Sequence, residues 1–228
     1  MNEQKLLRLT GLIGMLAALM GFTADWLLYG GFYGGDEFYT ISRQIMSAIS
    51  NTRLMAGGLL GPIEAAFYIV GFWHIYLVLR PGGKTLAAIT FGGLSWSVIV
   101  GAGAFHSAFV FKGLLLRAQK AIADPQISWF RALLNDASQY MHLLYNVMFI
   151  LGLAATFTFL FLILFRKTLY PKWMVLFVPT LWVLVLPQIA QNIPAPVGGM
   201  LLGGSLNLSF LLYFIISTTL LWSRKETN

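Results

Sequence analysis

Several ionisable side chains lie within long apolar stretches of this 228-residue sequence, among them Asp25, Glu64, His106 and His142. A charge in hydrocarbon costs roughly 2.5–3.5 kcal/mol on insertion scales, so such residues normally face a bundle interior and have partners. A buried carboxyl group favours its neutral form and would donate a proton, unless a nearby cation such as a protonated histidine holds it ionised. These residues therefore indicate acid–base catalysis, with Glu64 or Asp25 as acid and His106 or His142 as base.

This chemistry suits the isomerisation, cyclisation or hydrolysis of a lipophilic small molecule or lipid. A neutral buried carboxyl group can protonate a carbon–carbon double bond or an epoxide, and aromatic walls can stabilise the resulting carbocation. The aromatic residues available for such walls are Trp26, Tyr68, Tyr140 and Tyr145.

Zinc binding is a second chemistry open to the same side chains. His106 and His142 with Glu64 or Asp25 would form a catalytic ligand set of two histidines and a carboxylate. However, no HExxH or HxxxH motif occurs in the sequence. Haem is less favoured still, because ligation by two histidines would need them at matching depths, whereas His74 and His106 are expected at opposite depths. We therefore expect no cofactor, with zinc as the alternative.

The composition predicts that these residues lie in an all-α, polytopic transmembrane bundle. The chain is 58% hydrophobic and 10% charged, whereas soluble domains are about 45–50% apolar and about 25% charged. Apolar runs of about 20 residues are long enough to cross a bilayer. We predict one transmembrane domain over residues 1–228 with six spans, at about 9–29, 56–79, 85–111, 137–165, 173–192 and 200–222.

Two helices are predicted outside this simple scheme. Ile41, Ile45 and Ile49 recur every fourth residue, which indicates a short amphipathic helix on the surface. Asp124-Pro125 is a typical helix start, so one helix is expected from Pro125 through the fourth span to about Arg166.

The charges predict an orientation. With six spans, the N-terminus, the second and fourth loops and the C-terminal tail share one side and carry most of the short-loop Lys and Arg residues. The positive-inside rule then puts both termini in the cytoplasm. The net charge of +7 fits membrane lipids as partners and does not suggest nucleic acid. The absence of cysteine excludes disulfides and thiol catalysis.

With this orientation, every predicted span contributes polar residues to the outer half of the membrane. Asp25, Glu64, His106 and His142 belong to this layer, so we expect one pocket there. Side chains expected to contact the substrate are Trp26, Tyr68, Tyr145, Asn146, Gln188, Gln191, Asn192 and Asn207. A purely structural alternative is that the amides are hydrogen-bonding links between helices, that the histidines are satisfied by neighbours, and that Asp25 reaches the headgroups.

Several segments resemble a family of bacterial integral membrane proteins described as a domain of unknown function. They are Asp25-Trp26, Phe67-Tyr68 with Gly71-Phe72-Trp73, Tyr170-Pro171-Lys172-Trp173, and Pro194-Ala-Pro-Val-Gly-Gly through Asn207. The resemblance covers most of the chain and implies the bacterial inner membrane, but no activity. Small membrane-embedded isomerases and terpene cyclases also place acids among aromatics, which is an analogy only.

A different class of function is a small transporter, a channel or a lipid-binding accessory protein. Pro187 and Pro194–Pro196 lie near polar amides, as in a broken-helix binding site. Against transport, we find no inverted repeat and no polar path through the inner half. The substrate and the oligomeric state do not follow from the sequence.

Overall fold

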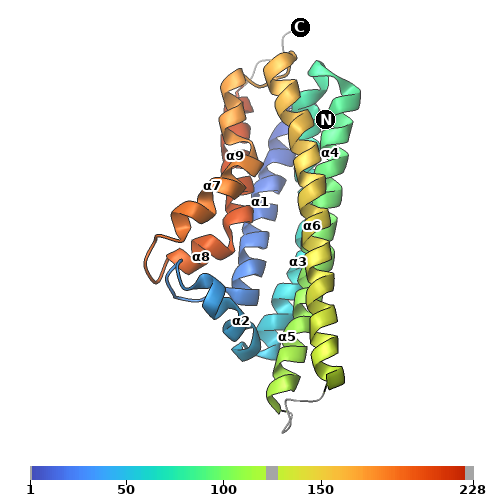
Figure 1. Cartoon of the computed structure of the whole chain (residues 1–228). Coiled ribbons are helices and arrows are strands. Elements are labelled where there is room, and N and C mark those ends of the chain that lie inside the picture. Colours follow the sequence, from blue (N-terminus) through green and yellow to red (C-terminus); the bar gives the residue numbers. More distant parts are fainter. Residues whose placement is uncertain (1, 122–127, 224–228) are drawn as a thin grey trace.

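The computed structural model describes residues 2–121 and 128–223, and over these residues the chain is all-α. Both termini lie at one end of an elongated bundle (Figure 1). Helix α1 packs mainly against α3 and α9, α4 packs against α3 and α6, and α7 packs against α9. The helices concerned are α1 (Glu3–Tyr29), α3 (Asn51–Leu79), α4 (Lys84–Val98), α6 (Ser128–Phe165), α7 (Pro179–Ala190) and α9 (Ser205–Leu221).

Among the described residues, four helical segments are long and apolar enough to cross a membrane. They are Glu3–Tyr29, Asn51–Gly82, Lys84–Ala121 and Ser128–Phe165. The third is composite: α4 passes into a π-helical segment, η2 (Ile99–Phe105), which leads into α5 (His106–Ala121). An all-α protein with membrane-spanning helices is therefore supported, in agreement with the composition.

The prediction of six spans is not confirmed, because the last two apolar runs are interrupted. The fifth divides into a 3₁₀ segment, η3 (Lys172–Phe177), and the 12-residue α7, which are separated by extended backbone at Val178. Twelve residues extend only about 18 Å. The sixth divides at Gly204 into α8 (Gly198–Gly203) and the 17-residue α9. Proline at the start of α7 and glycine between α8 and α9 account for both breaks.

Both additional helices that the sequence predicted are present. The amphipathic segment forms α2 (Phe38–Ala48), which packs against α5 at the end of the bundle opposite the termini (Figure 1). The long helix is α6, with 38 residues ending at Phe165. Its proposed start at Asp124-Pro125 lies outside the described residues. At 1.5 Å per residue α6 is about 57 Å long, well beyond the ~30 Å of a hydrocarbon core.

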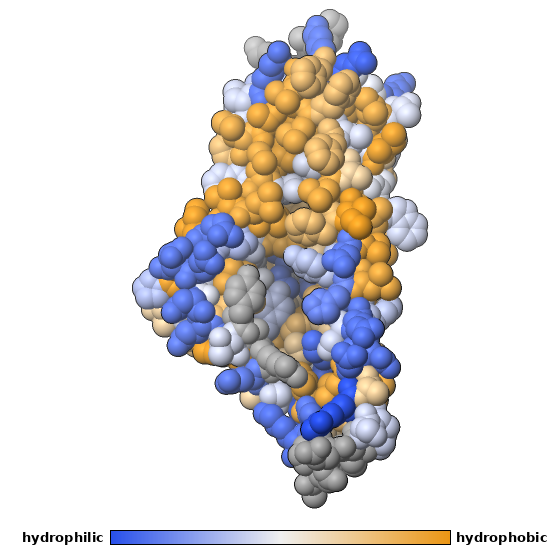
Figure 2. All heavy atoms as spheres, in the orientation of Figure 1, coloured by the Kyte–Doolittle hydropathy of each residue, from blue (hydrophilic) through white to orange (hydrophobic). Residues whose placement is uncertain are grey.

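The surface divides along the same axis. In the view of Figure 2, the half of the bundle nearer the termini is largely hydrophobic, and hydrophilic residues gather over the other half. The larger buried apolar cluster, which includes Leu7, Phe72, Phe159, Phe214 and Leu221, fills the half nearer the termini. A smaller apolar cluster, which includes Leu28, Leu54 and Phe109, lies in the opposite half together with the buried acids.

His74 is the main polar residue inside the apolar half, and its hydrogen bonds are satisfied. The Nδ1–H donates to the Leu7 carbonyl oxygen (2.9 Å), since a carbonyl can only accept, and Nε2 therefore accepts from the Ser217 hydroxyl (2.7 Å). The Ser217 Oγ also lies 2.5 Å from the Tyr170 hydroxyl, which contacts the Tyr213 hydroxyl at the same distance. This network joins α1, α3 and α9 to the segment between α6 and η3.

We expect His74→Leu to lower the free energy of unfolding by about 1–2 kcal/mol, because Ser217 loses its acceptor inside an apolar core. Thr10→Val is the matched control, since the Thr10 hydroxyl bonds to Leu6 of its own helix at 2.8 Å and lies 3.4 Å from His74. Denaturant titration in detergent measures both. Equal losses of unfolding free energy in the two variants would show that the hydrogen bonds of His74 to α1 and α9 do not stabilise the bundle.

Candidate functional site

A cavity of about 520 Å³ lies between α1 and α3 on one side and α6 and α7 on the other. Residues from α2, α4, η2, α5, α8 and α9 complete its lining. Figure 2 shows a recess in the surface between the lobe formed by α7 and α8 and the helix α6. The walls are mainly apolar and aromatic, and include Phe72, Leu94, Phe105, Phe149 and Phe210. This volume and lining suit a small lipophilic molecule.

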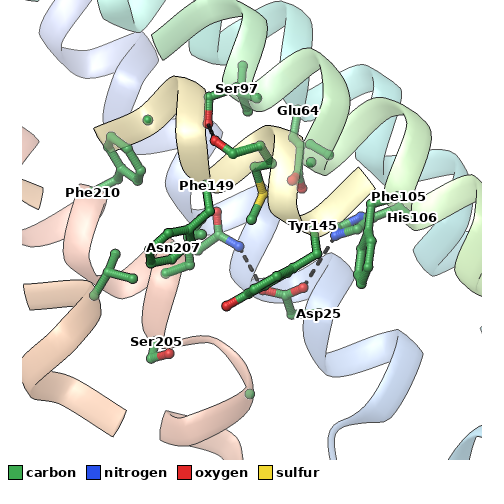
Figure 3. Close-up of a pocket in the computed structure, with 18 of the residues that line it drawn as sticks. Asp25, Glu64, Ser97, Phe105, His106, Tyr145, Phe149, Ser205, Asn207 and Phe210 are labelled. Atoms are coloured by element: carbon green, nitrogen blue, oxygen red, sulfur yellow. Dashed lines mark hydrogen bonds and ion pairs between the residues drawn. The ribbon is translucent and has the colours of Figure 1, made fainter. Parts of the chain in front are cut away.

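Asp25 is the centre of a buried hydrogen-bond network at this cavity (Figure 3). Its Oδ2 accepts from the Asn207 side-chain amide at 2.7 Å, and its Oδ1 lies 3.3 Å from His106 Nε2. The Tyr68 hydroxyl donates to the other side of the Asn207 amide, at 2.6 Å. Helices α1, α3, α5 and α9 each supply one member, so the network depends on the whole bundle.

The pairing with Asp25 orients the His106 ring. A carboxylate oxygen can only accept, so a hydrogen bond across this 3.3 Å contact requires a proton on Nε2. The Nδ1 atom is buried and has no hydrogen-bond partner among the described residues. When the imidazole is neutral, Nδ1 carries the free lone pair and is the basic nitrogen. A carboxylate that orients an imidazole in this way is a common support for a general base.

Glu64 is the second buried acid of the cavity and is 2% exposed. Its Oε2 atom makes no hydrogen bond to the residues that the structure describes. Figure 3 shows its carboxyl group directed into the same space as the Asp25 and His106 side chains. A buried polar atom without a partner is rare in native structures, and at a cavity wall it leaves a position for a ligand or a water molecule.

Two glycines allow the helices to approach closely enough to form this network. A Cβ atom at Gly21 would lie 2.2 Å from the Asn207 Oδ1, and one at Gly61 would lie 2.1 Å from the Ala102 carbonyl oxygen and 2.7 Å from His106 Nδ1. Any larger residue would overlap with these atoms. The two positions set the spacing of α9 from α1 and of η2 and α5 from α3.

The end of α1 that carries Asp25 is fixed by an arginine from α3. The Arg53 guanidinium donates to the carbonyl oxygens of Trp26 (2.7 Å) and Leu27 (2.9 Å), and also to that of Gly30. Helix α1 has no basic residue in its own last turn. Arg53 thus satisfies the free carbonyls and complements the negative end of the helix dipole.

The π-helical segment η2 directly precedes His106. Short π-helical turns are rare and often occur at functional sites. Here Ala102 of η2 packs against Gly61 of α3, while Gly101 faces Met148 of α6. The Ser97 hydroxyl, just before the segment, donates to the Met148 carbonyl oxygen at 2.8 Å. Because a π-turn is wider than an α-turn, residues after it are rotated relative to residues before it, and His106 faces α1.

A model of the family described as "Family of unknown function (DUF6796)" matches residues 1–224. The chain belongs to this family. No curated protein matches it, and no solved structure does. Membership of DUF6796 confirms the expected family of unknown function. The match itself carries no bacterial origin, membrane topology or activity.

In this DUF6796 member, all four predicted catalytic residues line the same cavity: Asp25, Glu64, His106 and His142. His142 lies on the α6 wall and is exposed, whereas the other three are buried. Three of the residues predicted to contact a substrate also line the cavity: Tyr68, Tyr145 and Asn207. Tyr68 and Asn207 do so as members of the Asp25 network.

The other predicted contact residues do not line the cavity. Trp26 follows Asp25 by one residue, which turns it about 100° around the helix, and it packs against Arg53. Asn146 lies beside the lining stripe of α6. Gln188, Gln191 and Asn192 are exposed at the end of α7, where the Gln191 amide donates to the Gln188 side chain and the Asn192 amide to the Gln188 backbone. Tyr140 is exposed and also lies outside.

Sequence reasoning missed several lining residues. On α6 the lining repeats every three or four positions, so extending the face of Tyr145 would have found Ser138, Met141, Met148 and Gly152. The Gly101-Ala-Gly-Ala run was the available signal for η2, because glycine is unfavourable within an α-helix.

The zinc alternative has no support from the geometry. Over residues 2–121 and 128–223, no three His, Asp or Glu side chains come together in the manner of a metal site. His106 is instead directed at Asp25 through Nε2.

Proposed function

We propose that this protein is a membrane-embedded enzyme that performs acid–base chemistry on a lipophilic small molecule or lipid. The observation that carries the proposal is the free Glu64 Oε2 atom in the same cavity as the Asp25–His106 pair. One carboxyl group is held by two neighbours, whereas the other makes no hydrogen bond through Oε2. Two acids in unlike surroundings are the usual arrangement for separate acid and base roles.

In the proposed reaction Glu64 gives a proton to a substrate carbon or to an epoxide oxygen. His106, held by Asp25, removes a proton from a neighbouring carbon. An isomerisation then moves a double bond with no redox step and no net gain or loss of protons by the substrate. Between turnovers the His106 imidazolium releases its proton to water and the Glu64 carboxylate takes one up, which restores the starting state. The aromatic walls, including Phe105, Phe149 and Phe210, stabilise the intermediate positive charge. In a hydrolysis the same histidine would activate water.

Lipid access follows from the packing of the walls. Helices α6 and α7 make few contacts with each other, although both line the cavity. A lipophilic substrate would enter from the bilayer between them. This route fits a six-crossing arrangement in the bacterial inner membrane, in which η3–α7 and α8–α9 form the last two crossings and both termini are cytoplasmic.

The test measures whether the protein incorporates isotopes from labelled water into lipid. We expect the protein in nanodiscs, incubated with a bacterial lipid extract in D₂O, to transfer deuterium into one lipid species as that species changes retention time. Hydrolysis would instead introduce oxygen from H₂¹⁸O. Mass spectrometry of the extracted lipids measures both. Empty nanodiscs are the control, and no label above their level in any species would contradict an enzymatic role.

The interrupted α7, α8 and α9, which all contribute to the cavity, favour a second candidate, a carrier or lipid-binding protein. Uptake of a lipophilic molecule into proteoliposomes, without isotope exchange, would favour the carrier or lipid-binding protein. Isotope exchange without uptake would select the enzyme.

A further inference from the structure

A second cavity, of about 320 Å³, lies between α5 and α6 near the ends that face away from the chain termini. It is more polar than the main cavity. The residues that line it are Lys112, Leu116, Gln119, Arg131, Leu134, Asn135 and Ser138.

The lining of this second cavity favours an anion. Lys112 and Arg131 supply two positive charges, and Gln119 and Asn135 supply amide hydrogen-bond donors. The Ser138 hydroxyl already donates to the Leu134 carbonyl oxygen at 2.8 Å. None of the described residues that line it is acidic. Both cations also interact with other residues of the chain, so an anion would join an existing polar network. Clustered cations and amide donors match the several acceptor oxygens of a phosphate group.

The two cavities are neighbours. Lys112 and Ser138 line both of them, one from α5 and the other from α6. The main cavity is apolar and aromatic, and the second is polar and basic. Both helices belong to 38-residue apolar segments, so their outer ends extend beyond the ~30 Å hydrocarbon core. A molecule occupying both cavities would have its tail at membrane depth and its charged end at the polar boundary.

We propose that the substrate is an amphiphile with a phosphate head group, bound by Lys112 and Arg131, and an apolar chain in the main cavity. This inference rests on the proposed function and names the substrate class for the same site. The head group anchors the molecule, which places a bond of the chain between Glu64 and the Asp25–His106 pair.

The test uses three probes with the full chain in uncharged maltoside detergent. Dodecyl phosphate has both parts, dodecanol lacks the charge, and inorganic phosphate lacks the chain. We expect dodecyl phosphate to bind tightest by calorimetry. Lys112→Gln and Arg131→Gln should each weaken it about tenfold, and the double variant about a hundredfold, with dodecanol changed less than about twofold.

Lys120→Gln is the matched control, because it removes one positive charge from an exposed position of α5 that does not line the cavity. An equal loss of affinity for dodecyl phosphate in this variant would mean that the overall positive charge of the surface attracts the anion, and it would overturn the proposal. Lys112→Arg keeps the charge and should bind within about twofold of the parent protein. If inorganic phosphate bound as tightly as dodecyl phosphate, the site would bind a free anion, and the proposal of an amphiphilic substrate would be overturned.

The proposed head-group site and the proposed enzymatic activity can be disproved independently of each other. Binding of dodecyl phosphate that depends on Lys112 and Arg131, without isotope exchange in any lipid, would leave the head-group site standing and remove the enzyme. Isotope exchange into an uncharged lipid, unaffected by Lys112→Gln, would leave the enzyme standing and remove the head-group site.

Discussion

Replacing Glu64 by glutamine is expected to lower the rate of deuterium transfer into lipid at least about a hundredfold, the usual contribution of one general acid. Glutamine has nearly the same shape but cannot supply the proton. Because Oε2 makes no hydrogen bond to the described residues, the substitution breaks none at that atom. The midpoint of thermal unfolding should therefore stay the same or rise. Lipid mass spectrometry in D₂O measures the rate.

Glu37→Gln is the control for this experiment. Glu37 lies just before α2, outside the cavity, and its carboxylate accepts from the Gly34 backbone amide at 3.2 Å. This variant should exchange deuterium at the parent rate. Full exchange by Glu64→Gln would remove Glu64 from the acid role, even if the protein proves to be an enzyme.

Replacing Gly61 by alanine is expected to destabilise the bundle by about 1–3 kcal/mol, the range for overpacking a tight interface. The added methyl group would lie 2.1 Å from the Ala102 carbonyl oxygen, which is backbone and cannot rotate away. Helix α3 and segment η2 must then separate. His106 moves with η2, so its contact with Asp25 lengthens and isotope exchange should fall together with stability.

Gly103→Ala is the matched control in the same π-helical segment. A Cβ atom there has nothing within 4 Å, so no comparable loss is expected. The free energy of unfolding in detergent and the exchange rate are measured for both variants. Equal stability of the two would mean that Gly61 does not set the distance between α3 and η2.

The sequence determined the helical class and the presence of helices long and apolar enough to cross a membrane, because apolar runs of span length require internally hydrogen-bonded backbone. It also indicated the depth of Asp25, Glu64, His106 and Asn207, since position along a helix is proportional to residue number. That arithmetic places these residues at one level when the chain crosses six times. The same argument could not separate Asn207, which holds Asp25, from Gln188, Gln191 and Asn192, which are exposed.

Only the tertiary structure decided which side chains meet at that level. The direction of a side chain around its helix depends on local winding, which η2 alters before His106, and on helix spacing, which Gly21 and Gly61 set. The breaks at Val178 and Gly204 likewise shorten the last two apolar runs to α7 and α9. Position along an apolar run determines how deep a residue lies, whereas packing between distant segments determines what it faces, because those contacts have no counterpart in local sequence.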